Sequence, residues 1–420
     1  MGDVLKTTWA LLLGVLLLML GNGLQGTLLG IRGAIEGFST WQMSLIMSAY
    51  FLGFFGGSRL TPEMIRRVGH VRVFAALGSF ISAVLVLFPT VTEPWAWIIL
   101  RVIIGFSFSG VYVTAESWLN NAATNQNRGK ALSLYLIVQM LGIVTAQGIV
   151  ALGDPSGFVL FIIPSVLVSI SFAPILLSVN PTPAFDTAKG MTLRQLYDVS
   201  PLGVVGIFLL GGVFSAQFGM GSVYATQAGL SVKHLSVFIA MIYVGALFLQ
   251  YPIGWLSDRM DRRKLVAGAA AVGTVACLAG AASGGNYAVL LGVAFLTGGA
   301  ANPLYSLLLA YTNDFLDHED MASASAGLIF VNGTGAIAGP VVTGWLMGVA
   351  GPAGFWLLIG ALLAAITAYA LYRMTRRPAG SVQDAGGFVA VSPASSAITV
   401  EAAQEWAMEE GAEAPGNNAA

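Results

Sequence analysis

The sequence predicts an all-α integral membrane protein with twelve transmembrane helices, arranged as two six-helix parallel repeats. Hydrophobic residues make up 56% of the chain and charged residues only 9%, whereas a soluble protein carries roughly a quarter charged residues. Twelve segments reach the length of about 20 mostly apolar residues that a bilayer requires. The two halves of the chain also share residues at one fixed spacing. The 52 glycines suit such a protein, because small residues let membrane helices approach closely.

The predicted spans follow one another from the start of the chain. The first begins shortly after Lys6 and is too long for the core of a signal peptide, so we expect it to be retained. In chain order the predicted spans are 8–31, 41–61, 72–91, 95–119, 129–152, 157–178, 201–226, 236–256, 265–284, 286–311, 322–348 and 353–373.

Lysine and arginine predict the orientation of these spans, because both residues are enriched in cytoplasmic loops. With the N-terminus inside, all but three of the 19 Lys and Arg residues fall in cytoplasmic segments. The exceptions are Arg32 and Lys233, which fall outside, and Arg101, which falls within the fourth span. The sequence therefore predicts that both termini face the cytoplasm.

Repetition divides the chain into two halves. With six spans in each half, the second half starts in the same orientation as the first, which predicts parallel repeats. The halves are expected at 1–178 and 201–373, joined by a cytoplasmic linker at 179–200. The region 374–420 is rich in Ala, Gly, Ser and Glu and is expected to be a disordered cytoplasmic tail, with a short acidic helix over 395–414 as the alternative. Three identical pairs are each 192 positions apart, namely Gln25 and Gln217, Ser39 and Ser231, and Gly53 and Gly245.

Several classes of function find no support in the sequence. A net charge of −1 gives no indication of nucleic-acid binding, and the single cysteine, Cys277, excludes an intramolecular disulfide or a cysteine metal cluster. His70, His234 and His318 lie far apart in predicted loops, so no metal site is expected. The chain has no G-x-x-x-x-G-K-[ST] nucleotide loop and no converging catalytic groups in its spans. We expect no enzymatic activity, no cofactor and no obligate protein partner.

Three motifs resemble those of one transporter family. Residues 254–264, GWLSDRMDRRK, resemble the cytoplasmic loop motif G-x-L-x-D-R-x-G-R-R of the major facilitator superfamily, with Asp261 at the second glycine. RVIIG at 101–105 is similar to the family's fourth-span arginine motif. GTGAIAGPVV at 333–342 resembles its glycine–proline motif, although it lies in the eleventh span rather than the fifth. The resemblance implies the major facilitator fold.

A narrower resemblance covers residues 1 to about 375. STWQ at 39–42, Glu116-Ser117, NRG at 127–129 and QYPIGWLSDR at 250–259 are similar to the bacterial YcaD-like branch of the superfamily. Members of this branch are largely transporters without an assigned substrate. The resemblance therefore implies a multi-pass transporter of the bacterial inner membrane and leaves its solute open.

The loop motif also indicates a cytoplasmic gate. Gly254 would permit close helix packing, Asp258 would cap a neighbouring helix, and the arginines would pair across the interface between the halves. In the equivalent first-half loop, 59–72, Arg66 stands where the second copy has Asp258. The predicted gate residues are Gly254, Asp258, Arg259, Arg262, Arg66, Arg67, Arg72, Arg128, Asp317 and Asp320.

The loop between the tenth and eleventh spans is acidic and contains no Lys or Arg. We expect its carboxylates to cap the eleventh helix and to pair with first-half arginines when the cytoplasmic side is closed. The alternative of an acidic, solvated loop stays open. The carboxylates are Asp314, Asp317, Glu319 and Asp320, and the arginines are Arg66, Arg67 and Arg72.

Polar residues at membrane depth are costly and usually face a cavity. Asn22, Gln25 and Arg32 share one face of the first span. Arg32 either attracts an anionic solute, extends to the outer headgroups or pairs with Glu36. The remaining predicted lining residues are Gln139, Gln217, Tyr224, Tyr243, Gln250, Asn302, Tyr305 and Asn332.

Glu116 is the only carboxylate that falls within a predicted span. It is the candidate for proton coupling, together with Arg101. Alternatively, Glu116 belongs to a structural charge network with Arg128 and Arg259, and Arg101 braces the fourth span against the first.

These observations predict a secondary active transporter that moves a small solute by alternating access. The two halves would rock around a central site, with the cytoplasmic loops as inner gate and with protons as a possible second substrate. Efflux of drugs or metabolites and uptake of organic anions both stay open. The other alternative is a membrane sensor on the same fold that transports nothing.

Overall fold

The computed structural model describes residues 2–122, 128–176, 191–316, 318–376, 387–396, 398–403 and 406, and all descriptions below refer to these residues. Within them, the regular secondary structure is helical, as predicted. The first half contains α1 (Gly2–Ile35), α2 (Thr40–Val68), α3 (His70–Leu87), α4 (Pro94–Ala122), α5 (Arg128–Leu152) and α6 (Val159–Leu176).

The second half begins with the short helix α7 (Leu193–Val199). A continuous helical run follows, in which a π-helical turn, η2, interrupts the α-helix. The elements are α8 (Pro201–Ser215), η2 (Ala216–Met220), α9 (Gly221–Gln227), α10 (Val232–Ser257), α11 (Arg262–Ala282), α12 (Tyr287–Asn313), α13 (His318–Ala350) and α14 (Ala353–Arg376).

Each of the twelve predicted spans coincides with a helix or, for 201–226, with the run from α8 to α9. Ten of these stretches are long and apolar enough to cross a membrane. The other two are α6 and α2. The apolar part of α6 is the shorter Val159–Ala173, and the last turn of α2 contains Arg66 and Arg67. The all-α membrane fold is therefore confirmed, and the count of twelve crossings stays a prediction.

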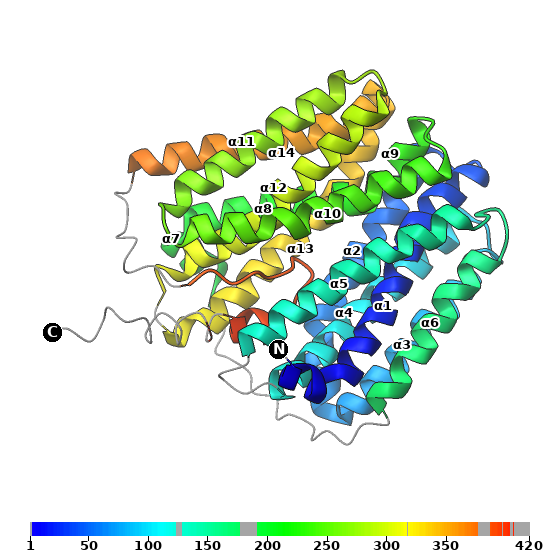
Figure 1. Ribbon diagram of the computed structural model, residues 1–420, viewed down its shortest axis with the longest axis horizontal. Coiled ribbons are helices and arrows are strands. Elements are labelled where there is room, and N and C mark those ends of the chain that lie inside the picture. Colours follow the sequence, from blue (N-terminus) through cyan, green and yellow to red (C-terminus); the bar gives the residue numbers. More distant parts are fainter. Residues whose placement is uncertain are drawn as a thin grey trace.

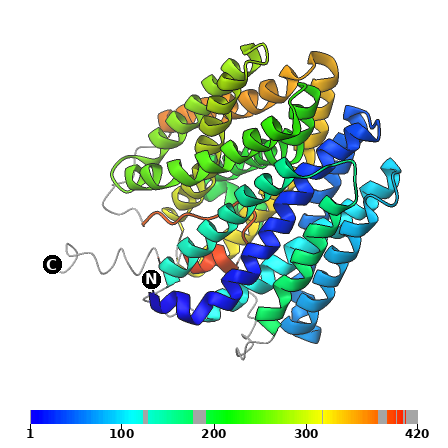
Figure 2. The ribbon, with the colours of Figure 1, turned by 45° about the vertical axis from the view of Figure 1, so that its right-hand side comes forward.

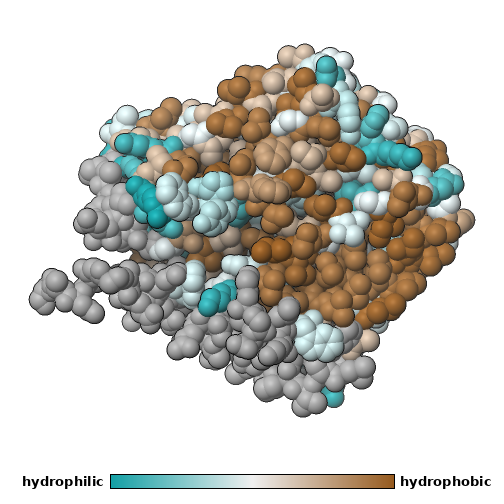
Figure 3. All heavy atoms as spheres, viewed as in Figure 1, coloured by the Kyte–Doolittle hydropathy of each residue, from teal (hydrophilic) through white to brown (hydrophobic). Residues whose placement is uncertain are grey.

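The outer surface fits a lipid environment. Large apolar side chains such as Phe80, Phe248 and Val275 are more than half exposed. Figure 3 shows hydrophobic residues along the sides of the helices and hydrophilic ones gathered toward their ends. Because lipid tails are apolar, such side chains need no protein partner there.

The two halves pack their helices in the same order. In the first half α2 packs on α4, α1 on α5 and α6, and α3 on α4 and α6. In the second half α10 packs on α12, α8 on α13 and α14, and α11 on α12 and α14. Figure 1 shows the first half, in blue to cyan, beside the second half, in green to orange. This repeated packing is what parallel repeats require.

Two glycines predicted to be equivalent perform the same packing function. A Cβ atom added at Gly53 would overlap the carbonyl oxygen of Val102 on α4. A Cβ atom added at Gly245 would overlap the carbonyl oxygen of Phe295 on α12. In both halves, therefore, the second helix approaches the fourth at backbone distance, which only glycine permits.

The serine pair of the repeat also has one function. The Ser39 and Ser231 side chains each accept a hydrogen bond from the backbone N–H three residues further on, and so cap α2 and α10. Each serine follows a turn that contains a glycine with positive φ, +77° at Gly37 and +76° at Gly229. The local chemistry that starts the second helix is thus repeated.

The halves meet closely at the end predicted to face outside. A Cβ atom at Gly30 of α1 would overlap the Ser222 side chain of α9. The Ser48 hydroxyl of α2 donates a hydrogen bond of 2.6 Å to the Ile337 carbonyl of α13. Besides these α1–α9 and α2–α13 contacts, α5 packs on α10.

A different element fills the opposite end. Residues 387–396 form an irregular stretch with a turn at Pro393 and Ala394, residues 398–403 are helical, and they lie between the halves. In both views the orange-to-red end of the chain passes between the two groups of helices (Figure 1 and Figure 2). We expected a disordered tail over 374–420, and for these residues that expectation is wrong. Their contacts are described below.

Candidate functional site

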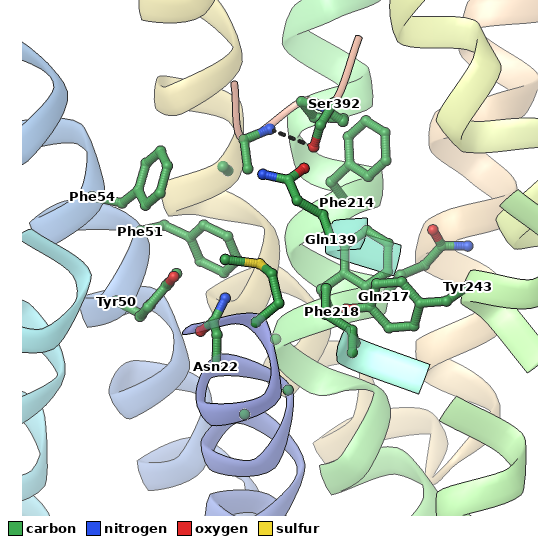
Figure 4. Close-up of a pocket in the computed structure, with 18 of the residues that line it drawn as sticks. Asn22, Tyr50, Phe51, Phe54, Gln139, Phe214, Gln217, Phe218, Tyr243 and Ser392 are labelled. Atoms are coloured by element: carbon green, nitrogen blue, oxygen red, sulfur yellow. Dashed lines mark hydrogen bonds between the residues drawn. The ribbon is translucent and has the colours of Figure 1, made fainter. Parts of the chain in front are cut away.

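A cavity of about 200 Å³ lies between the two halves. Helices of both halves and three tail residues line it (Figure 4). Seven predicted polar residues are among its lining residues: Asn22, Gln25, Gln139, Gln217, Tyr243, Asn302 and Asn332.

A chain of hydrogen bonds joins the polar face of α1 to α4. Asn22 Nδ2 donates to the Tyr112 hydroxyl at 2.8 Å, and Gln25 Nε2 donates to Asn22 Oδ1 at 3.1 Å. Arg101 Nη1 donates to Gln25 Oε1 at 2.7 Å. The bond from Arg101 joins α4 to α1, as the bracing alternative for this arginine anticipated.

Arg101 is a buried cation at the cavity wall, with 3% of its surface exposed. Its guanidinium lies 4.5 Å from the centre of the Tyr50 ring, and its Nε is 3.4 Å from the Ile46 carbonyl. Within the part of the chain that the structure describes, its contacts are neutral groups and not a carboxylate. A buried cation ordinarily requires an ionic partner. The Gln25 amide, the Ile46 carbonyl and the face of the Tyr50 ring therefore stabilise the charge of Arg101 only partly.

Aromatic residues from both halves form the apolar walls of the cavity. The Phe214 and Phe218 rings stack at 5.7 Å, and Phe218 lies 4.9 Å from Tyr243. Figure 4 shows this group facing Asn22 and the α2 aromatic residues across the cavity. The α2 wall consists of Tyr50, Phe51, Phe54 and Phe55.

Sequence reasoning missed this α2 wall. Tyr50, Phe54 and Ser58 are four residues apart in turn, and Phe51 and Phe55 follow the same spacing. That spacing places all five on one helical face, which was the available signal. Aromatic residues in a span also pack in cores and face lipid, so the spacing alone does not distinguish a cavity wall.

Gln217 lies in the π-helical turn of the seventh predicted span. Its side chain is buried and lines the cavity, and neither amide atom has a hydrogen-bond partner among the described residues. Its repeat counterpart Gln25, in contrast, bonds to Arg101. A buried unpaired amide costs free energy unless a ligand or water satisfies it, and π-helical turns often occur at functional sites.

Arg32 does not line the cavity. Its Nε atom lies 2.6 Å from Glu36 Oε1, and its Nη1 bonds to the carbonyls of Pro155 and Ser156. The pairing with Glu36 is the alternative that the sequence left open. The loop after α5 supplies the other two partners, and sequence spacing could not indicate them.

Three further predicted lining residues are placed elsewhere. The Tyr224 ring stacks on Phe355 at 4.6 Å. Gln250 Nε2 lies 3.5 Å from the Ser306 hydroxyl. Tyr305 is fully buried, and its hydroxyl has no hydrogen-bond partner in the described ranges. All three face the interior of the second half, so polarity in a span does not by itself identify a cavity residue.

Glu116 is buried and accepts two hydrogen bonds. The Tyr135 hydroxyl donates to Oε1 at 2.9 Å, and the Ser396 backbone N–H donates to Oε2 at 2.7 Å. Of the predicted partners, Arg259 instead lies over the Trp255 ring at 4.2 Å. The tail thus contributes a partner that the sequence did not suggest.

Among the described residues, the arginines and carboxylates predicted to pair across the halves have the following partners. Arg66 and Arg67 pair with Glu63 on their own helix, and Asp314 pairs with Arg262 of its own half. Arg72 and Asp320 are exposed, Arg128 begins α5, and Asp317 lies outside the described residues. Arg66 and Arg67 thus share the single carboxylate of Glu63 in this structure, and their pairing with the acidic loop stays a prediction.

The second-half loop motif contacts the tail. The Asp258 carboxylate was expected to cap a neighbouring helix, but it accepts a hydrogen bond of 2.9 Å from the Phe388 backbone N–H. Gly254 was expected to permit close helix packing. A Cβ atom there would lie 2.6 Å from the Phe388 ring, so the packing partner is the tail.

Asp261 caps α11 by accepting a hydrogen bond of 3.0 Å from the Arg263 backbone N–H. Burial raises the pKa of Asp261, but hydrogen bonds from the side chain and backbone of Arg263 outweigh burial, so the pKa lies below its usual value. The departure from glycine in the motif therefore supplies a helix cap.

Comparison with known proteins decides the family. The family model of the major facilitator superfamily matches residues 11–248 and 204–406. The chain belongs to the major facilitator superfamily. This major facilitator is a multi-pass membrane transporter and not an enzyme.

One curated relative and two solved structures illustrate the likeness. The uncharacterized MFS-type transporter YcaD of Escherichia coli O7:K1 is 26% identical over 354 residues, which cover 83% of this chain and 90% of the relative. The nucleoside transporter NupG has a TM-score of 0.71 at 14% identity, covering 88% of this chain and all of its own. A bacterial homologue of the human lysosomal transporter Spinster, in an inward-facing and occupied conformation, has a TM-score of 0.72 at 14% identity and covers 90% and 98%. The YcaD-like resemblance is thus confirmed. The two solved structures, at 14% identity, show only that this major facilitator has the same fold.

Proposed function

We propose that this transporter moves a small organic anion with an apolar or aromatic body across the bacterial inner membrane. The central cavity is its solute site, and both chain termini face the cytoplasm. The observation that carries the proposal is Arg101, a buried cation at the cavity wall whose described contacts are all neutral.

An anionic group on the solute would give Arg101 an ionic partner. Burying a lone charge is unfavourable, and a carboxylate or phosphate gives a guanidinium strong, geometrically matched hydrogen bonds. Gln217, across the cavity, has two unpaired amide atoms that suit a further polar group. The Phe214, Phe218 and Tyr243 rings would cover the apolar body.

Transport follows from alternating exposure of this site. Close contacts such as Gly30 with Ser222 seal the end predicted to face outside, so the halves must separate there for the solute to leave or enter. Because the repeats pack in the same order, rocking of one half against the other is the motion we propose. Proton coupling through Glu116 stays a prediction, and Glu116→Gln would remove the titratable group.

Ligand binding to the purified protein tests the solute class. We would compare each carboxylate of an organic panel with its neutral primary amide, using thermal unfolding as readout. A ligand at a hundredfold excess over its dissociation constant adds about 2.7 kcal/mol to the free energy of unfolding. We expect carboxylates to stabilise the wild type, and Arg101→Gln to abolish this effect.

Arg32→Gln is the matched control, because Arg32 is also buried but pairs with Glu36 outside the cavity. This variant should retain stabilisation by carboxylates. Equal stabilisation by carboxylates and amides, or carboxylate binding that survives in Arg101→Gln, would refute the anion assignment.

A further inference from the structure

The end of the cavity predicted to face the cytoplasm holds part of the chain's own C-terminal region. We call residues 387–396 and 398–403 the tail segment. The Phe388 N–H donates to Asp258 at the end of α10. The Val391 N–H donates to the Ser306 hydroxyl of α12 at 3.0 Å, and this hydroxyl lies 3.2 Å from the Val391 carbonyl.

Further along, the tail segment crosses from the second half to the first. Asn332 of α13 donates to the Pro393 carbonyl at 3.3 Å, and the Ser396 N–H donates to Glu116 of α4 at 2.7 Å. Between these anchors Ser392, Pro393 and Ala394 form part of the cavity wall. The segment therefore lies directly beside the proposed solute site and is bonded to both halves.

The helices recognise the backbone of this segment. The side chains of Asp258, Ser306, Asn332 and Glu116 bond to its N–H and C=O groups. Main-chain hydrogen bonds of this kind are how proteins hold extended peptides largely without regard to sequence. The two carboxylates accept N–H groups near opposite ends of the 387–396 stretch, the exposed Asp258 at its start and the buried Glu116 at its end.

Apolar contacts add to these bonds. The Phe388 ring packs on Gly254, and the Trp406 ring packs on Gly129 of α5. Val391 and Val400 are buried, with at most 3% of their surface exposed. Burial of such side chains stabilises the bound state, and the covalent tether keeps the local concentration of the segment high.

We propose that this end of the cavity is a binding site for the tail segment, and that the bound segment closes the solute pathway from the cytoplasmic side. The inference rests on the proposed function only in taking the cavity as that pathway. Because the segment bonds to Glu116 in one half and to Ser306 in the other, rocking requires its release.

Thiol modification tests the site without any knowledge of the solute. Ser58 lines the cavity, and among the described residues its hydroxyl bonds to the Phe55 carbonyl of its own helix. We would place Ser58→Cys in a Cys277→Ala background and measure modification by a membrane-impermeant reagent in inside-out vesicles. A chain ending at Arg376 should react at least about tenfold faster than the full chain, since each tenfold change corresponds to only 1.4 kcal/mol of protection.

Two proline variants of the full chain guard against an effect of truncation on folding. Val391→Pro removes the N–H that bonds to Ser306, and should raise the modification rate by about tenfold, the change expected for the loss of one hydrogen bond. Ala390→Pro is the matched control, because no described hydrogen bond uses its N–H, and it should react like the full chain. Equal rates for the full chain, the truncated chain and Val391→Pro would overturn the proposal, whatever the outcome of the Arg101 experiment.

Discussion

Arg101 and Glu116 are the two charged side chains of α4, and their surroundings differ. Glu116 accepts hydrogen bonds from Tyr135 and from the tail segment. Arg101 faces the cavity with an amide, a carbonyl and a ring as neighbours. The carboxylate is therefore satisfied by the protein, whereas the guanidinium keeps the capacity to bind an anion.

Arg101→Lys separates the charge of this residue from its geometry. Lysine keeps a positive charge but cannot both bond to Gln25 and lie flat on the Tyr50 ring. We expect affinity for a carboxylate ligand to fall about tenfold, because the lysine ammonium group cannot form the two parallel hydrogen bonds that a planar guanidinium gives a carboxylate. The loss should be smaller than in Arg101→Gln, which also removes the charge. Isothermal titration of the three proteins measures this order. A lysine variant that binds like the glutamine variant would mean that geometry, and not charge, selects the ligand.

At the scale of the element, helix contact depends on a few glycines. Gly53→Ala and Gly245→Ala should each lower the free energy of unfolding by about 1–3 kcal/mol, because the added methyl group meets a backbone carbonyl that cannot move away. Gly148→Ala and Gly292→Ala are the controls, since open space surrounds these helical positions. There alanine should be neutral or stabilising by up to about 1 kcal/mol.

Thermal unfolding in detergent compares the four variants. The same change of stability at crowded and open positions would show that close backbone approach does not govern these sites.

The start of α11 gives a second prediction for an element. Asp261→Ala should cost about 1 kcal/mol through loss of the cap, whereas Asp261→Asn should retain most of it. The folded-state pKa of Asp261 is lowered, so its contribution is fully present above the unfolded pKa of about 3.9 and is lost as the pH falls through the folded value. Unfolding measured from pH 6 down to pH 3 should therefore narrow the difference in stability between the wild type and Asp261→Ala.

At the scale of the whole molecule, the structure combines close contacts at the end predicted to face outside with a tail segment at the end predicted to face the cytoplasm. Gly344 of α13 meets the Ser44 side chain of α2 at the outer seal, whereas Gly348, one turn on, has open space around it. Gly344→Leu should push the halves apart at this end, and Gly348→Leu should not.

Modification of Ser222→Cys from the outside, in the Cys277→Ala background, reports this opening. Ser222 lines the cavity and contacts Gly30 in the seal. We expect faster modification in Gly344→Leu alone. A rate that neither leucine changes would contradict the proposal that these contacts close the outer side.

Much of this architecture was predictable because it depends on side chains with a clear signature. Apolar length predicted the helices. The pairs Gly53 with Gly245 and Ser39 with Ser231 predicted equivalent positions in the two halves, and the structure gives each pair one function, close packing for the glycines and capping for the serines. The polar face of α1 was predictable because one helix fixes its own spacing.

The remainder depends on contacts that one sequence does not reveal. Arg32 is paired through carbonyls of a distant loop, which carry no residue signature. The tail segment has the composition of a disordered region, yet it binds through its backbone to Ser306 and Glu116. Disorder was inferred from a composition rich in Ala, Gly, Ser and Glu, but here the two halves provide the partners that hold the segment.

Solute counterflow in proteoliposomes tests the central claim most directly. With a carboxylate identified by thermal unfolding, we predict saturable exchange by the wild type and by Arg32→Gln, and none by Arg101→Gln. Exchange that persists in Arg101→Gln, or binding without any exchange in the wild type, would contradict the account. The first result would reject the anion site at Arg101, and the second would identify a sensor in place of a transporter.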